Sequence, residues 1–547
     1  MQALVVAGLA AAVPAAATVP AADSDQLSTY VTARAADALG DPARAAQLFA
    51  NLSRERPGDM TIRRRAIVGA IAAGDMKLAL QLGRSMPIAE TPLDLRLLMV
   101  ADELRAGRHK QAVEILRTRQ GIIDSSFLAP FAEAWGLAER RNGRAMEALS
   151  QVVPGSALAN QLNEQRAFLY LKLKQPKAAA SYAEVAVAEA GGRADRLRLA
   201  LADGFMAAGD RAYALQLLEG DGPALAEGRA RVAAGKQTGQ AIDSGAKAFS
   251  ELMVGMSLAL GRLKDKGLPI AFAQVARYAN PQNSAGAILL ALLLEGDERP
   301  TDALDILHAI DPSDPFASEA ADAEVRMLVD SKRHPEALQR AAEIVAQKPG
   351  PDAYARLGVV QIEMKDFAAA ADSYARAIHA AASAPSSDEP WMLRLYRASA
   401  LEESGKWEEA KAELALALKD RPDNPLLLNF LGYGKLERGE DMDAAEAMVR
   451  KASALRPDDA SITDSLGWAE FKRGRLSQAI STLQRAAAAD PSQAEIQEHL
   501  GDALYSAGRR YEARFAWRAA LVSAEDDDRL RIQAKIDAGL TPTTAAP

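Results

Sequence analysis

Apolar residues recur along most of the chain with the 3.6-residue spacing of helices that bury one face, and short polar turns separate these runs. Alanine and leucine supply most of the apolar positions, which suits closely packed antiparallel helices. No stretch alternates between apolar and polar residues for long enough to predict a sheet strand. The pattern predicts an all-α protein with about 14–15 helix pairs between Leu27 and Ala520.

The clearest repetition lies in the last part of the chain, from Leu426 to Ala520. Three Leu-Gly pairs stand 35 and then 34 residues apart, at Leu431-Gly432, Leu466-Gly467 and Leu500-Gly501. A second glycine follows seven residues after each of these glycines, at Gly439, Gly474 and Gly508. An alanine then opens another apolar run, at Ala445, Ala479 and Ala513. In each unit the glycine of the pair lets the second helix approach the first closely, and the alanine is the small residue on the second helix.

Turn residues and alanine spacing carry the same period towards the N-terminus. The second helices contain alanines 32–36 residues apart, at Ala45, Ala79, Ala112, Ala148 and again at Ala271, Ala303, Ala337, Ala370. The first turn, Gly40-Asp41-Pro42, places an N-capping aspartate before a proline at the first helical position. We therefore expect the helix pairs to begin near Leu27.

This pattern of Leu-Gly, Gly and Ala with a period of 34 residues, punctuated by prolines at Pro422, Pro457 and Pro491, resembles the tetratricopeptide repeat (TPR). The resemblance implies an all-α, right-handed superhelical solenoid in which helix pairs stack along one axis. It also implies that the first helix of each pair lines an inner groove, where peptides or proteins bind.

We predict three blocks of repeats: N-terminal repeats over 23–220, central repeats over 246–382 and C-terminal repeats over 390–525. An amphipathic helix over 526–538 follows the last block. Its polar face can close the stack, as terminal caps must.

Three further segments depart from the period. Residues 221–245 are glycine-rich and form a degenerate repeat, a bend between two stacks or a binding loop. Residues 383–389 are a polar linker insert, and we expect residues 539–547 to be a disordered tail.

The chain starts with an apolar leader, residues 1–22, whose run from Leu4 to Ala17 ends in Ala15-Ala16-Ala17. Such a run is typical of a secretory signal peptide, although Met1-Gln2 supplies no basic residue before it. We expect export to the periplasm or cell envelope, and no transmembrane span because the run is too short. The alternatives are a start codon further upstream and an uncleaved leader on a cytoplasmic protein.

Composition narrows the classes of function. Lys and Arg total 65 against 73 for Asp and Glu, a net charge of −8, which disfavours a nucleic-acid partner. The absence of cysteine excludes thiol catalysis, Cys-based metal sites and a lipid-modified N-terminal cysteine in this sequence. The five histidines are widely separated, and His499 is expected to be a surface or partly packed helix residue. We expect no cofactor, no metal and no enzymatic activity.

In the TPR family, ligands meet the groove through fixed positions of the first helix, and the resemblance transfers these positions onto the last three repeats. The candidate protein-binding residues are Asn429, Tyr433, Asp464, Trp468, Phe471, Glu498, Asp502 and Tyr505. Packing against neighbouring repeats is the alternative for Trp468 and the favoured role for Phe471. A clamp for a C-terminal carboxylate, as in chaperone-binding TPR proteins, is disfavoured because only Lys472 supplies a cation at the matching positions.

Residues Leu427 to Leu521 are also similar to the C-terminal repeats of long proteobacterial envelope TPR proteins. The marks of this resemblance are the strings Asn429 to Tyr433, Asp464 to Trp468 and His499 to Asp502, followed by Arg514 and Trp517.

This narrower resemblance implies a scaffold or adaptor for an envelope protease or assembly complex, and it suggests a periplasmic carboxyl-terminal processing protease as the partner. The sequence departs from the lipoprotein adaptors of that class because it has no lipid-attachment cysteine. The alternatives are a cytoplasmic TPR co-factor in secretion or regulation and an enzyme with an unrecognised site.

Overall fold

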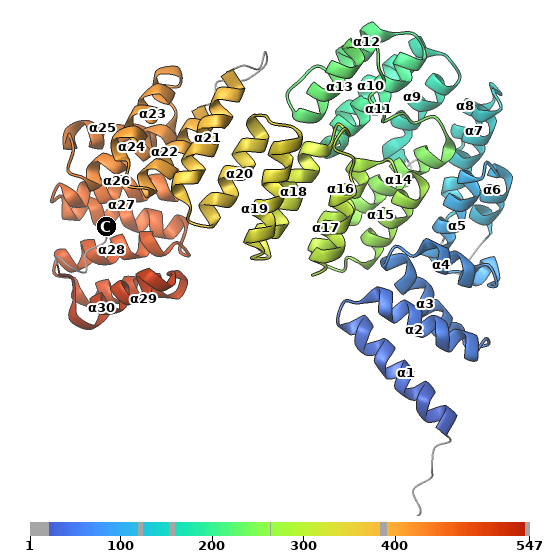
Figure 1. Ribbon diagram of the computed structural model, residues 1–547, viewed down its shortest axis with the longest axis horizontal. Coiled ribbons are helices and arrows are strands. Elements are labelled where there is room, and N and C mark those ends of the chain that lie inside the picture. Colours follow the sequence, from blue (N-terminus) through green and yellow to red (C-terminus); the bar gives the residue numbers. More distant parts are fainter. Residues whose placement is uncertain (1–20, 119–123, 153–158, 263, 383–390, 542–547) are drawn as a thin grey trace, which may run out of the picture. The chain divides into compact units, whose positions relative to one another are not determined.

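The computed structural model describes residues 21–118, 124–152, 159–262, 264–382 and 391–541 (Figure 1). Over these residues the chain forms 30 α-helices and four short 3-10 helices, and the described parts contain no strand. Thirty helices correspond to the predicted number of about 14–15 pairs, so the all-α, repeat-built fold class is confirmed.

Two compact units divide the chain: unit 1 covers Met1–Ser331 and unit 2 covers Lys332–Pro547. The boundary falls inside the range 246–382 that the sequence groups as central repeats. The predicted leader lies outside the described residues except for its last two positions, which begin the first helix. The predicted linker at 383–389 and most of the tail also lie outside the described residues.

Unit 1 is built from eighteen α-helices and four 3-10 helices. The α-helices are α1 (Ala21–Ala38), α2 (Pro42–Glu55), α3 (Met60–Ala72), α4 (Met76–Gly83), α5 (Leu93–Arg105), α6 (His109–Arg117), α7 (Ala129–Glu139), α8 (Ala145–Leu149), α9 (Leu162–Lys172), α10 (Pro176–Glu189), α11 (Ala194–Ala207), α12 (Arg211–Leu217), α13 (Pro223–Ala233), α14 (Gly245–Leu260), α15 (Gly267–Ala279), α16 (Ser284–Glu295), α17 (Pro300–His308) and α18 (Ala317–Asp330). The 3-10 helices are η1 (Ile88–Glu90), η2 (Ser126–Leu128), η3 (Ala159–Gln161) and η4 (Gly191–Arg193).

The predicted turn chemistry is present between the first helices. Gly40 takes a left-handed conformation with φ 74° after α1. Asp41 then caps α2, because its carboxylate accepts a hydrogen bond from the Arg44 N–H at 2.9 Å, and Pro42 is the first residue of that helix. The same arrangement recurs at Gly74, where Asp75 caps α4.

Unit 1 is more than a row of neighbouring pairs, because α14 and α15 pack back onto helices much earlier in the chain (Figure 1). The Tyr278 hydroxyl of α15 donates to Asp102 Oδ1 of α5 at 2.7 Å. At the start of α14, the Gly245 N–H donates to Glu139 Oε1 of α7 at 2.8 Å. The helices α3, α5 and α7 are the first members of their pairs, so the face expected to line a groove is covered here by the chain itself.

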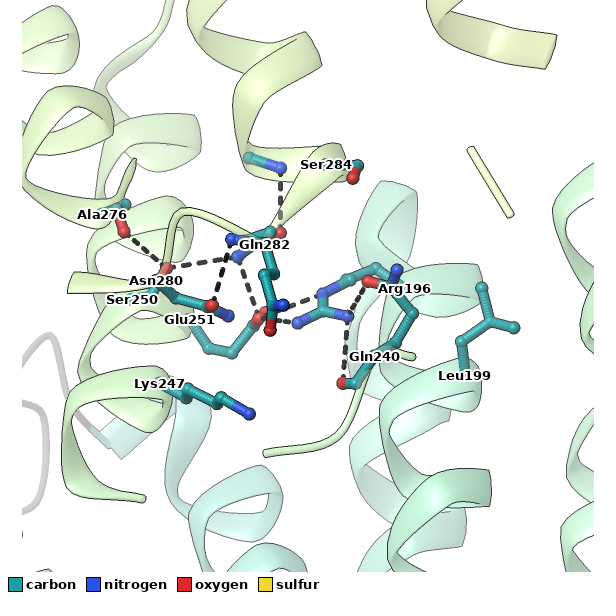
Figure 2. Close-up of polar contacts among 12 residues, drawn as sticks. Arg196, Leu199, Gln240, Lys247, Ser250, Glu251, Ala276, Asn280, Gln282 and Ser284 are labelled. Atoms are coloured by element: carbon teal, nitrogen blue, oxygen red, sulfur yellow. Dashed lines mark hydrogen bonds and ion pairs between the residues drawn. The ribbon is translucent and has the colours of Figure 1, made fainter. Parts of the chain in front are cut away.

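The glycine-rich segment contains one helix, α13, and then an irregular loop over 234–244. Buried hydrogen bonds hold this loop against the rest of unit 1. The Asp203 carboxylate, fully buried in α11, accepts the N–H groups of Thr238 at 2.5 Å and Gln240 at 2.7 Å. Figure 2 shows Arg196 between Gln240 and Glu251, donating to the Gln240 carbonyl at 3.2 Å and to Glu251 Oε1 at 2.8 Å. These buried bonds join α11, the loop and α14.

Unit 2 contains the twelve remaining helices. They are α19 (His334–Gln347), α20 (Pro351–Glu363), α21 (Phe367–Ala382), α22 (Trp391–Glu403), α23 (Trp407–Asp420), α24 (Pro425–Glu437), α25 (Met442–Leu455), α26 (Ala460–Lys472), α27 (Leu476–Ala489), α28 (Ala494–Ser506), α29 (Arg510–Ser523) and α30 (Asp526–Ala538). Within the described residues of the whole chain, no helix combines the length and apolar character needed to cross a membrane.

Close contact at the Leu-Gly glycines holds the last three pairs of unit 2 together. A Cβ atom at Gly467 would lie 2.6 Å from Leu483 Cγ, and one at Gly501 would lie 2.3 Å from Trp517 Cδ1. The alanine on the second helix, such as Ala479, is fully buried. A glycine inside a helix costs roughly 1 kcal/mol relative to alanine, so this packing must contribute at least as much.

Replacing Asp203 with alanine should release the loop of unit 1. Two buried N–H groups would lose their acceptor, at a cost of about 1–3 kcal/mol for each unsatisfied group. Trypsin should then cleave faster after Lys236, which is exposed in that loop. Asp210→Ala, which removes only the cap of α12, is the control and should leave this cleavage rate unchanged. Equal rates for the two variants would contradict the assigned role of Asp203.

Replacing Gly467 with valine should destabilise unit 2 by about 1–3 kcal/mol, because the new side chain overpacks against Leu483. Gly350→Val is the matched control, since a Cβ atom at Gly350 has no heavy atom within 4 Å and its backbone is extended. Urea unfolding followed by tryptophan fluorescence measures both. A Gly467→Val transition at the wild-type midpoint would show that the close approach is not required.

A candidate binding groove in unit 2

The first helices of three successive pairs, α24, α26 and α28, pack in a row and border a pocket of about 170 Å³. Its lining includes Phe430 of α24 and Glu402 of α22. Other polar residues in the lining include Asn429, Tyr433, Ser461, Asp464, Gln493 and Glu495. Three of the candidates from the sequence, Asn429, Tyr433 and Asp464, are therefore brought together at one place.

Trp468 lies under this surface and not on it, with only 1% of its area exposed. Its ring stacks on His499 with centroids 4.0 Å apart and on Phe471 with centroids 4.7 Å apart. Its indole N–H donates to Glu437 Oε1 at 2.5 Å. Both aromatic rings thus pack against neighbouring side chains, which is the alternative given for Trp468 and the favoured role given for Phe471.

Glu498 and Asp502 are buried beneath the terminal helix α30. Lys535 of that helix is fully buried, and its ammonium donates to Glu498 Oε1 at 2.5 Å and to Asp502 Oδ2 at 2.8 Å. Asp502 Oδ1 also accepts from the Trp517 indole N–H at 2.8 Å. In this structure the cap helix, and not a partner, occupies the side of α28 where the sequence places two ligand contacts.

Tyr505, the last candidate, is half-buried and packs beside Trp517 with ring centroids 5.4 Å apart. The chain returns closely over it at the end of α30, since a Cβ atom at Gly539 would lie 2.2 Å from the Tyr505 hydroxyl. Tyr505 is therefore also part of the cap packing.

The buried pair Asp464–His499 lies at the pocket, which Asp464 lines. Asp464 is 4% exposed and His499 is 1% exposed, and His499 Nδ1 lies 2.8 Å from Asp464 Oδ2. Burial alone would lower the pKa of His499, but the charge and hydrogen bond of Asp464 raise it above the ordinary value of 6.5. The expectation that His499 is a surface or partly packed residue is corrected, because it is a buried ion-pair partner.

Tyr433 is also surrounded by negatively charged carboxylates. Its hydroxyl donates to Glu495 Oε1 at 3.0 Å. Burial, followed by the charge of Glu495 and of other nearby carboxylates, raises the pKa of Tyr433. Asp464, Glu495 and His499 each offer one potential metal-ligand atom, and these atoms lie within 4.8 Å of one another.

The raised pKa of His499 predicts a specific pH dependence. Because the pKa is higher in the folded than in the unfolded chain, the stabilising ion pair is fully present below pH 6.5 and is lost as the pH rises through the folded pKa. NMR titration of the five histidines, with His499→Gln to assign the signal, should give His499 a pKa above 6.5. In Asp464→Asn the pKa should fall. A wild-type value at or below 6.5 would contradict the ion pair.

Comparison with known proteins adds family information. A family model described as TPR repeat matches residues 467–508, and a model described as tetratricopeptide repeat matches residues 30–93 and 323–385. No curated protein sequence gives a significant match.

Comparison with solved structures finds similar chains at low sequence identity, with TM-scores of 0.25 to 0.37. MamA AMB-1 is 20% identical over 33% of this chain and 96% of its own, with a TM-score of 0.25. One chain of the APC/C hetero-tetramer Cut9-Hcn1 is 14% identical over 95% of this chain and 97% of its own, with a TM-score of 0.37. Yeast Tom70 is 11% identical over 94% and 96%, with a TM-score of 0.33. At these TM-scores the likenesses carry no argument about fold or function. The family models support the tetratricopeptide repeat superfamily, and the structure contains the stacked helices that this repeat implies.

Proposed function

We propose that this protein is a non-catalytic scaffold or adaptor that binds protein or peptide partners through the pocket on α24, α26 and α28. The observation that carries the proposal is the contrast between the units. In unit 1 the first-helix face of α3, α5 and α7 is covered by α14 and α15, whereas in unit 2 the corresponding face has a pocket lined with hydrogen-bonding groups. The repeats matched by the family models support protein binding as the general role.

We further propose that the partner belongs to a cell-envelope protease or assembly complex, with a periplasmic carboxyl-terminal processing protease as the first candidate. The similarity of residues 427–521 to envelope TPR proteins and the signal-peptide-like leader support this proposal. A cytoplasmic co-factor is the alternative. N-terminal sequencing of the mature protein distinguishes the two, because export predicts removal of the leader and an intact Met1 in the cytosol would refute it.

Binding in the pocket is tested by blocking it with one bulky cation. Ser461 is exposed at the rim in α26, so Ser461→Arg should leave the fold intact and fill the entrance. Ser477→Arg, at an exposed serine of α27 in the same repeat, is the matched control. In affinity capture from envelope and cytosolic fractions, Ser461→Arg should lose a partner at least about tenfold, equivalent to about 1.4 kcal/mol, while the control retains it. Equal capture by both variants would place the binding site elsewhere.

A further inference from the structure

The charged residues that line the pocket in unit 2 are all acidic. Its nine lining residues include three carboxylates, those of Glu402, Asp464 and Glu495, and no lysine, arginine or histidine. Glu402 is paired outside this lining, where Arg438 Nη1 donates to Glu402 Oε1 at 2.8 Å. Glu495 is exposed at the rim, and its carboxylate accepts a hydrogen bond from the neutral Tyr433 hydroxyl. Because Glu402 is paired with Arg438 and Asp464 with His499, the negative charge that favours a cationic ligand comes from Glu495.

One buried carboxylate oxygen at the pocket has no donor. Asp464 Oδ2 is bound to His499, but Asp464 Oδ1 is buried and has no hydrogen-bond partner among the described residues. Buried polar atoms are nearly always paired, and an unpaired carboxylate oxygen is costly. His499 is itself held by stacking on Trp468, so the carboxylate is fixed in one orientation. A donor that enters the pocket can satisfy this preorganised oxygen.

The size of the pocket suits a guanidinium. His499 Nδ1 already shares its hydrogen bond with Asp464, and His499 is not among the residues that line the pocket. A guanidinium presents five N–H donors in a plane, which suits several separated acceptors in a volume of about 170 Å³. The ring of Phe430, which also lines the pocket, offers an aromatic surface on which such a plane can stack.

We propose that this pocket binds an arginine side chain of a partner polypeptide, with Asp464 Oδ1 and the Glu495 carboxylate accepting hydrogen bonds from its guanidinium. This inference rests on the proposed function, because it assigns the chemistry that a protein partner presents to the pocket. Charge complementarity identifies the occupant: the exposed rim carboxylate attracts the guanidinium, and the buried Asp464 oxygen orients it.

Synthetic peptides test the assignment on the full chain. Saturation-transfer NMR compares blocked Gly-Gly-Arg-Gly-Gly with the same peptide carrying citrulline, which keeps the shape of arginine without its charge. The arginine peptide should bind, and the citrulline peptide should bind at least about tenfold more weakly because the charge-assisted bonds are lost. Binding should also weaken as salt is added. Equal binding of the two peptides, or no binding of the arginine peptide, would overturn the proposal.

Variants locate the binding within the pocket. Glu495→Gln removes an exposed carboxylate and should weaken the arginine peptide about tenfold without loss of fold, checked by circular dichroism. Glu512→Gln changes an exposed carboxylate of α29 and should have no effect. In a separate experiment, the protein is titrated with ZnCl₂ or MnCl₂ alone to test whether the site binds a metal ion. A metal that binds stoichiometrically, depends on His499 and excludes the arginine peptide would overturn the proposal in favour of a metal site.

Failure here and failure of the proposed function give different results. If the arginine peptide does not bind but Ser461→Arg still abolishes partner capture, the pocket binds partners and the arginine assignment is wrong. If the arginine peptide binds and depends on Glu495 but Ser461→Arg leaves capture unchanged, the arginine site stands and the proposed route of partner binding is wrong.

Discussion

The close approach of two helices at a glycine is the contact on which the repeats depend. At Gly467 there is no room for even one more carbon atom before Leu483, and at Gly501 the indole of Trp517 fills the corresponding space. Because the small residues bring the second helix of each pair against the first, the opposite face of the first helix is turned away from its partner. Packing within the pair therefore determines which side chains are left for a ligand.

The two units use that remaining face differently. In unit 1 it is covered by α14 and α15, which are tied to earlier helices by bonds such as Tyr278 to Asp102 and Gly245 to Glu139. In unit 2 the face of α24, α26 and α28 keeps a polar pocket. At its end, α30 covers α28, where Lys535 pairs with Glu498 and Asp502 and Arg531 also pairs with Glu498. The pocket on α24, α26 and α28 thus lies in the middle of the C-terminal repeats.

The period of 34 and its glycines were enough to predict the helices and the fold class, since these follow from local spacing. The resemblance to the TPR family pointed to Asn429, Tyr433 and Asp464, which line one pocket in the structure. The return of α15 onto α5 could not be predicted, because its bonds join residues 176 positions apart and leave no periodic trace. Lys535 was missed for a related reason: a lysine in a terminal helix is normally solvated, and only the buried Glu498 and Asp502 explain its position. Predicting the Asp464–His499 pair would have required knowledge of how adjacent repeats align, because the two residues lie on different repeats.

The contrast between a covered face and an open one is tested most directly by cysteine labelling, since the chain has no cysteine of its own. Ser461→Cys places a thiol at the pocket rim of unit 2, and Gln274→Cys places one on α15, where Gln274 Nε2 lies 3.4 Å from the Ala72 carbonyl of α3. With maleimide under native conditions, the thiol at 461 should react at least about 100-fold faster than the thiol at 274, because the latter reacts only when α15 opens. Similar rates at the two positions would contradict the account.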